Sequence, residues 1–129
     1  MLARTSSDLT RAAAELGDTA LAVTADVTEP AEVAAAVAQV EERWGLIDLV
    51  VHNAGNASVI GPLLEADSDA WWDEVAVHLR GAMLPARACL PIMIERGVGR
   101  VVLVYGDLGD SGSPWCSAYA AGRRACCGS

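Results

Sequence analysis

The stretch that most constrains this sequence is LIDLVVHNAG, residues 46–55, in which a short apolar run ends in Asn-Ala-Gly. Four of the five residues from Ile47 to Val51 are aliphatic, which is typical of a strand buried on both faces. The small residues that follow allow a ligand to approach the backbone closely, and ligands bind at this end of the strands in open α/β sheets. The stretch therefore predicts a central parallel strand, followed either by a ligand-binding turn or by an ordinary loop.

The rest of the sequence predicts helices and strands in alternation. Apolar periodicity and capping residues predict helices over residues 5–16, 28–44, 67–96 and 117–125. Strands are predicted over residues 19–24, 47–51 and 100–104. Residues 1–4 are too few to form an element. The alternation indicates an α/β fold with a parallel sheet and right-handed crossovers.

Two local features refine these helices. Thr28 is expected to cap the second helix, because Pro30 and Glu32 follow at first-turn positions. Pro85 lies inside the long third helix, so we expect a bend or a break near Gly81–Pro85.

Composition excludes several classes of protein. A chain of 129 residues is about one domain, and its 53% hydrophobic content argues against disorder. No apolar run reaches the ~18 residues of a membrane span. The N-terminus lacks the basic region and apolar core of a secretory signal, so we expect a cytoplasmic protein that does not contact membranes.

Charge and cysteine content indicate which kinds of partner and metal site are expected. The net charge of −8 argues against a nucleic-acid partner, because phosphate binding needs a basic face. The four cysteines are Cys89, Cys116, Cys126 and Cys127, and none is part of a C-x-x-C pair. We therefore expect no metal site, and buried free thiols in a reducing compartment.

A set of short motifs resembles the short-chain dehydrogenase/reductase family. The motifs are Asp26-Val27-Thr28, Asn53-Ala54-Gly55, a long helix, the strand GRVVLV and Tyr119-x-x-x-Arg123. Each motif is weak alone, but all occur in matching order and on matching elements, from about Arg4 to the last residue. The resemblance implies a fragment of a Rossmann-like doubly wound parallel sheet with helices on both faces. Residues 1–129 would then form a single, partial NAD(P)-binding domain.

The resemblance also implies a nicotinamide cofactor and hydride exchange with a small alcohol or carbonyl substrate. Asp26 would bind the adenine amino group, with Val27 beside the ring; the alternative is that Asp26 only caps the end of a strand. Arg4 falls where the family places a basic residue for a 2′-phosphate, which favours NADP(H) over NAD(H), unless Arg4 is only a solvated surface residue. Asn53 would pin the central strands, and Ala54 and Gly55 would line the ribose.

Three residues match the catalytic positions of the family. Tyr119 would exchange a proton with the substrate oxygen, and a phenol of pKa about 10 needs a nearby positive charge to do so near neutrality. The family has a lysine one helical turn later that also holds the ribose, whereas this chain has Arg123, which supplies charge but does not release a proton. His78 aligns with an asparagine of the family and can still hydrogen-bond. His52 is interpreted as a tolerated turn residue.

One catalytic hydroxyl of the family is missing. Its serine lies thirteen residues before the tyrosine, where this sequence has Gly106. Nearby hydroxyl groups that could substitute for it belong to Tyr105, Ser111 and Ser113. The active site is therefore expected to be degenerate.

The resemblance further implies that the chain is truncated at both ends. No T-G-x-x-x-G-I-G loop precedes Asp26, and the sequence ends soon after Tyr119, so the first strand, the pyrophosphate loop and the substrate lobe would be absent. In the strand order 3-2-1-4-5-6, the strands at 19–24 and 47–51 would be separated by a gap of two strands. Each buried backbone group left unpaired there costs about 1–3 kcal/mol.

Three interpretations follow from this. The first is an NAD(P)-dependent oxidoreductase that is impaired or inactive in this chain, which alone would bind the cofactor weakly or not at all. The alternative is a non-catalytic interaction fragment that pairs with a second copy or a full-length relative through Trp71–Leu90 and Ser117–Ala125. The third is an incomplete reading of a longer gene.

Overall fold

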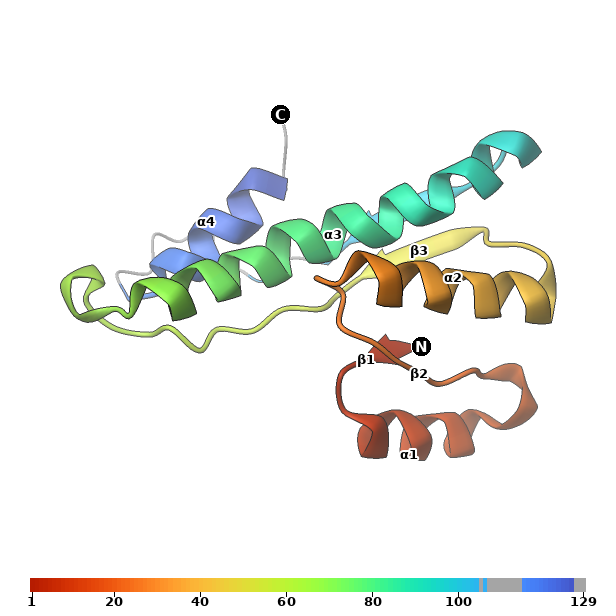
Figure 1. Cartoon of the computed structure of the whole chain (residues 1–129), viewed down its shortest axis with the longest axis horizontal. Helices are drawn as coiled ribbons and strands as arrows, with labels where there is room; N and C mark the ends of the chain where they lie inside the picture. Colours follow the sequence, from red (N-terminus) through yellow and green to blue (C-terminus); the bar gives the residue numbers. More distant parts are fainter. Residues whose placement is uncertain (105, 107–114, 127–129) are drawn as a thin grey trace. The chain divides into compact units, whose positions relative to one another are not determined.

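The computed structural model describes residues 1–104, 106 and 115–126. Along the chain its strands and helices are β1 (Leu2–Ala3), α1 (Ser6–Leu16), η1 (Gly17–Thr19), β2 (Val23–Thr24), α2 (Pro30–Trp44), β3 (Leu49–His52), η2 (Leu63–Glu65), α3 (Ser68–Arg96), β4 (Arg100–Leu103) and α4 (Ser117–Cys126) (Figure 1). Strands and helices alternate as the sequence predicts, so the fold class is α/β. Here η denotes a short 3-10 helix.

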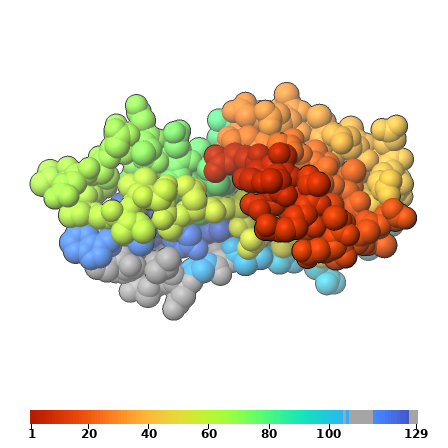
Figure 2. Space-filling model, turned by 90° about the horizontal axis from the view of Figure 1, so that it is seen from below, coloured from red at the N-terminus to blue at the C-terminus, as the bar shows by residue number. Residues whose placement is uncertain are grey.

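The chain divides into two compact units. The first comprises Met1–Val50 and Leu84–Arg100, and the second comprises Val51–Met83 and Val101–Ser129. The long helix α3 supplies its first part to the second unit and its last part to the first. In the first unit α1 contacts both β1 and β2, and Figure 2 shows α1 as the red part of that unit's surface.

The first sheet pairs β1 with β2 in parallel, with Leu2 opposite Val23 and Ala3 opposite Thr24. The expectation that residues 1–4 form no element is wrong. Two residues are enough to form a strand because two backbone hydrogen bonds hold β1 against β2. Val23 N–H donates to Met1 O, and Ala25 N–H donates to Ala3 O. The strand predicted at 19–24 is shorter than expected. Only Val23 and Thr24 form β2, and Thr19 belongs to η1.

The second sheet pairs β3 with β4. The Arg100 N–H donates to Asp48 O at 2.9 Å, and the Val104 N–H donates to His52 O at 2.9 Å. Both donors and acceptors advance by four residues in the same direction, so the pairing is parallel. In the described part of the chain β2 and β3 belong to different sheets, and β1 occupies a place next to β2 where the sequence predicts a gap.

The apolar core of the first unit is formed where α2, α3 and the start of β3 meet. Its buried centre is Ile47, Cys89 and Met93, packed against Val37, Val40, Val50 and Ile92. Burial raises the pKa of the Cys89 thiol, and the negative charge of Glu41 adds to this effect. Cys116 is also buried and Cys126 is half-buried, whereas Cys127 lies outside the described residues.

Two predictions about helix ends and interiors are wrong. The N-cap of α2 is Glu29 rather than Thr28, whose N–H and hydroxyl instead donate to Asp26 Oδ1 at 2.8 and 2.7 Å. Local turns of this kind compete with helix capping. The helix α3 continues through Pro85 and Pro91 without a break. Each proline removes one backbone hydrogen bond, and packing of the buried Leu84, Cys89 and Met93 around them holds the helix together.

The described helices include none that combines the length and the apolar character needed to cross a membrane.

Candidate active site

The three predicted catalytic residues converge in the second unit. His78 from α3 and Tyr119 and Arg123 from α4 are all buried. The rings of His78 and Tyr119 meet edge to face, with centroids 5.0 Å apart and planes at 81°. The Arg123 guanidinium carbon lies 5.6 Å from the centre of the Tyr119 ring. A buried phenol therefore contacts both a buried imidazole and a buried cation.

The guanidinium of Arg123 is held in place by backbone carbonyl groups. Its Nη1 donates to Val104 O at 2.8 Å, and its Nη2 donates to Ala54 O at 3.4 Å. These acceptors follow β4 and β3, so the ends of both strands position the charge. A buried cation requires such acceptors, because its desolvation is otherwise costly.

The phenol oxygen of Tyr119 accepts a hydrogen bond from the Gly106 N–H at 3.2 Å. A Cβ atom at position 106 would lie 2.5 Å from that oxygen, so the backbone approaches the tyrosine only because residue 106 is glycine. The position where the family has serine therefore supplies a backbone donor in place of a hydroxyl. Tyr105, Ser111 and Ser113 lie outside the described residues.

The imidazole of His78 is fully buried and neutral. Its Nε2 lies 3.0 Å from the carbonyl oxygen of Asn56, which can only accept, so Nε2 carries the proton. Its Nδ1 has no hydrogen-bond partner within the described residues. Burial lowers the pKa of His78 and the Arg123 charge lowers it further, against smaller opposing effects of the Asn56 carbonyl and Glu74.

His52 is a second buried histidine of this site, and its interpretation as a turn residue is wrong. It is the last residue of β3, and its pKa is lowered first by burial, then by the charge of Arg123, and third by repulsion from His78 when that ring is protonated. Strand alternation is the sequence signal that indicates its burial. His52 follows the half-buried Val50 by two residues and therefore lies on the same face of the strand.

Two glycines allow the site to close around His78. A Cβ at Gly122 would lie 2.6 Å from the Cβ of His78, so α4 approaches α3 closely at this point. A Cβ at Gly55 would meet Cε1 of His78 at 2.7 Å and would also collide with the guanidinium of Arg123. Both positions require glycine for close approach rather than for an unusual backbone angle.

Glu74 is a buried residue that the sequence analysis did not identify. Its carboxylate is 1% exposed, and Oε2 accepts from Ser58 N–H at 2.6 Å, Ser58 Oγ at 2.9 Å and Val59 N–H at 2.9 Å. Glu74 precedes His78 by four residues and thus shares its helix face, which is the only sequence signal that could have marked it.

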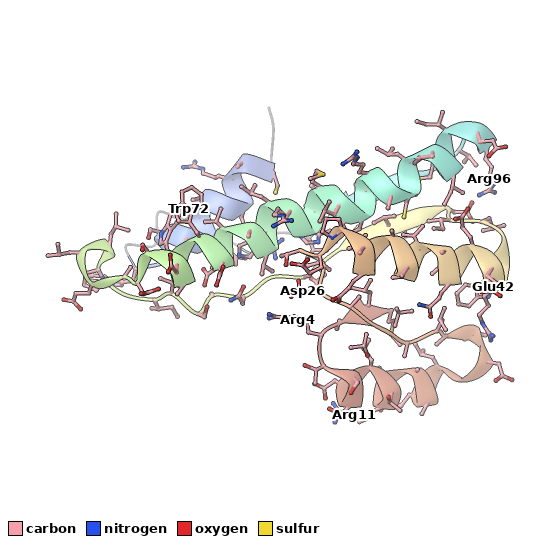
Figure 3. The ribbon with its side chains drawn as sticks, in the orientation of Figure 1. Arg4, Arg11, Asp26, Glu42, Trp72 and Arg96 are labelled. Carbon is pink, nitrogen blue, oxygen red and sulfur yellow. The ribbon has the colours of Figure 1, made fainter. Side chains whose placement is uncertain are left out.

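The residues expected to bind cofactor are distributed over both units. Asn53, Ala54 and Gly55 belong to the second unit, and the side chain of Asn53 is exposed. In the first unit, Arg4 Nη1 lies 4.0 Å from Asp26 Oδ2, with side-chain exposures of 67% and 30% (Figure 3). Val27 follows Asp26 and is half-buried.

The family model described as short chain dehydrogenase matches residues 1–128 of the chain. The chain belongs to the short-chain dehydrogenase/reductase family. Its elements are accordingly those of a Rossmann-like fold.

Individual members of the family resemble this short-chain dehydrogenase/reductase over most of its length. It is 36% identical over 105 residues to a short chain dehydrogenase of Monascus purpureus, covering 81% of this chain and 36% of that protein. It is 37% identical over 115 residues to an inactive 2-(S)-hydroxypropyl-CoM dehydrogenase of Xanthobacter autotrophicus, covering 89% and 50%. The structure of an actinorhodin polyketide ketoreductase with NADPH superposes with a TM-score of 0.87 at 31% identity, covering 95% and 49%.

The chain therefore spans between about a third and a half of the length of these relatives. Short-chain dehydrogenases/reductases use a nicotinamide cofactor, and the residues of the first unit fit its adenosine end. Asp26 offers a partly exposed carboxylate, and Arg4 offers a largely exposed cation. In the second unit, two of the five guanidinium donors of Arg123 already bind carbonyl groups, which leaves fewer for a ribose.

Proposed function

We propose that this chain carries the site of an NADP(H)-dependent oxidoreductase that acts on a small alcohol or carbonyl substrate. The observation that supports this most directly is the contact of Tyr119 with both His78 and Arg123. His78 lies on α3, whereas Tyr119 and Arg123 lie on α4, so the convergence of His78 with Tyr119 is a property of the fold.

In this proposal Tyr119 exchanges a proton with the substrate oxygen, and a bound nicotinamide would supply or accept the hydride at the substrate carbon. When a carbonyl is reduced, the Tyr119 hydroxyl gives its proton to the oxygen and becomes a phenolate. The Gly106 N–H donates to that phenolate oxygen, and the Arg123 charge stabilises it from beside the ring. His78 is neutral and orients the tyrosine ring by direct packing.

The proposed cofactor is NADP(H). Arg4 would bind the 2′-phosphate, Asp26 and Val27 would bind the adenine, and Ala54 and Gly55 would line the ribose. Solved relatives carry either cofactor, since the polyketide ketoreductase contains NADPH and a xylitol dehydrogenase contains NAD+, so the choice of NADP(H) rests on Arg4. We place the protein in the cytoplasm.

A second candidate function is a non-catalytic interaction fragment. Leu49 and Val51 of β3 and Val101 and Val102 of β4 are exposed, although β strands of this apolar character are normally covered. One of the relatives is an inactive dehydrogenase. In this case α3 and α4 would pair with a second copy of the chain or with a full-length relative.

A titration and a turnover assay on the full chain distinguish the two functions. We expect NADPH to bind more tightly than NADH, and its nicotinamide absorbance to fall when a small ketone is added. Replacing Tyr119 by phenylalanine should lower kcat by about 100-fold or more and leave the NADPH Kd unchanged, because only the proton donor is lost.

The matched control is Ala121→Ser, an exposed position on the same helix, which should leave kcat unchanged. Equal turnover by the wild type and the Tyr119→Phe variant would contradict the catalytic role. If the wild type shows no cofactor-dependent turnover and sediments as a dimer, the interaction fragment is the correct function.

A further inference from the structure

A closed ring of hydrogen bonds links the loop after β3 to one face of α3. The Asn56 carbonyl accepts from His78 Nε2 at 3.0 Å, and the Asn56 side-chain amide donates to Ser58 Oγ at 2.8 Å. The Ser58 hydroxyl in turn donates to Glu74 Oε2 at 2.9 Å. Because Glu74 and His78 are one helical turn apart, the ring closes through the helix itself.

Glu74 is the acceptor that anchors this ring. Its Oε2 binds three donors from Ser58 and Val59, and two of them are backbone N–H groups. Its Oε1 is buried and has no hydrogen-bond partner within the described residues. The carboxylate therefore binds only the loop among the described residues. Figure 2 shows the yellow-green loop residues beside the green first turns of α3. A buried carboxylate with this many backbone donors is a constraint on the loop rather than a solvated surface charge.

We propose that Glu74 is a positioning residue of the active site, which clamps residues 56–59 so that the Asn56 carbonyl fixes the orientation and the tautomer of His78. The catalytic meaning of this inference rests on the proposed function, but the clamp itself does not.

The clamp acts on Tyr119 through His78. With the proton held on Nε2, the Nδ1 of His78 is an acceptor that faces Gly55. The same ring packs edge to face on Tyr119, so a rotation of the imidazole would displace the phenol. Glu74 therefore determines the position of the proposed proton donor without touching it.

The charged and titratable groups around His78 are known from the structure. Arg123 lowers the pKa of His78, whereas the Asn56 carbonyl and Glu74 raise it. His52 interacts electrostatically with His78, Tyr119 packs on the imidazole, and Cys126 Sγ donates to His78 O at 3.6 Å. Removing the Glu74 charge leaves only the Asn56 carbonyl to oppose Arg123, so protonation of His78 becomes harder.

The test is nitrogen-15 NMR of the histidine side chains in the full chain, compared between wild type, Glu74→Gln and Glu74→Ala. Glutamine keeps an acceptor oxygen for the loop but loses the charge. We expect Glu74→Gln to retain the Nε2–H tautomer and to move the pKa of His78 further below its ordinary value. We expect Glu74→Ala to release the loop, so that the His78 signals show exchange between the two tautomers.

Asp73→Asn is the matched control, because it removes an exposed acid next to Glu74 on the same helix and should leave the His78 signals as in wild type. If the chain turns over substrate, Glu74→Ala should lower kcat by about tenfold or more with little change in KM, and Glu74→Gln should recover most of the loss.

A wild-type tautomer and titration of His78 in Glu74→Ala would overturn the inference, whatever the chain does with NADPH. Conversely, a chain without turnover that still shows the tautomer change refutes the proposed function and keeps the clamp. Should Glu74→Ala fail to fold, Glu74→Met gives the same reading, because it fills a similar volume without an acceptor for the loop. It removes all three bonds to Ser58 and Val59 and must weaken the His78 Nε2–H signature, and an unchanged signature would refute the clamp.

Discussion

At the scale of single residues, the site is defined by two neutral histidines next to a permanent cation. His52 and His78 are buried in the second unit, and Arg123 lies close enough to lower the pKa of both. An imidazolium in either place would meet the guanidinium charge in a region with little water. Folding therefore favours the unprotonated form of both rings, which couples stability to pH.

The expected consequence is a loss of stability in weak acid. The unfolded chain binds protons at the ordinary histidine pKa of 6.5, whereas the folded chain binds them only at lower pH. Stability is thus complete above pH 6.5 and falls as pH decreases, by up to about 1.4 kcal/mol per pH unit for each histidine. Urea unfolding measured from about pH 7.5 down to about pH 5, above the carboxylate range, tests this.

His52→Gln should remove one histidine's share of that slope, and this variant is the control. A free energy of unfolding that is constant between about pH 5 and pH 6.5, or that rises as pH falls, would show that the rings are not held neutral.

Residues of the site differ in how far the sequence could predict them. Tyr119 and Arg123 lie one helical turn apart, so their proximity follows from spacing alone, and His78 follows from its alignment with the family. Glu74 could not be predicted, because its burial depends on Ser58 and Val59 folding back onto α3 from sixteen and fifteen residues away. Long-range contacts of polar side chains leave no periodic pattern in the sequence.

At the scale of elements, the site depends on how closely α4 packs on α3. Gly122 faces the Cβ of His78, an atom fixed to the backbone of α3 that cannot move aside by a change of rotamer. A methyl group at position 122 must therefore separate the two helices or shift His78.

We expect overpacking in Gly122→Ala to cost about 1–3 kcal/mol. Alanine gains about 1 kcal/mol over glycine at a helix position, so the free energy of unfolding should fall by up to about 2 kcal/mol. Urea denaturation measures the difference, with Ala121→Gly as the control. That exposed neighbour on α4 should lose about 0.5–1 kcal/mol from backbone entropy alone. A stabilised Gly122→Ala variant would mean that the helices are not in close contact there.

The elements themselves were largely predictable, and the errors share one cause. Helices α1, α2 and α4 follow from apolar periodicity and from the glycines and proline at their ends. The two-residue strand β1 was missed because its evidence is pairing with β2 twenty-one residues away, not a pattern of its own. The break at Pro85 was wrongly predicted because local rules count the lost hydrogen bond and not the packing of Cys89 and Met93.

At the scale of the whole molecule, the surface combines strong acidity with exposed apolar side chains. The sequence has 17 acidic residues against nine basic ones, all of them arginine, and a net charge of −8 at pH 7. Large apolar residues are nevertheless exposed in both units, and Leu64 is 96% exposed. Mutual repulsion between copies therefore opposes an attraction between apolar surfaces.

We expect this balance to shift with pH and salt. Near pH 4.5, the isoelectric point of the chain, repulsion vanishes and self-association should be strongest. At neutral pH, salt at about 0.1 M reduces the range of repulsion to about 10 Å, so association should increase with salt but remain below its level at the isoelectric point. Light scattering as a function of pH and salt measures this.

Replacing Leu64 by serine should reduce the association at pH 4.5, whereas replacing the exposed Thr10 by serine should not. Light scattering that is lowest at pH 4.5, or that does not change with salt at neutral pH, would mean that charge repulsion does not limit self-association.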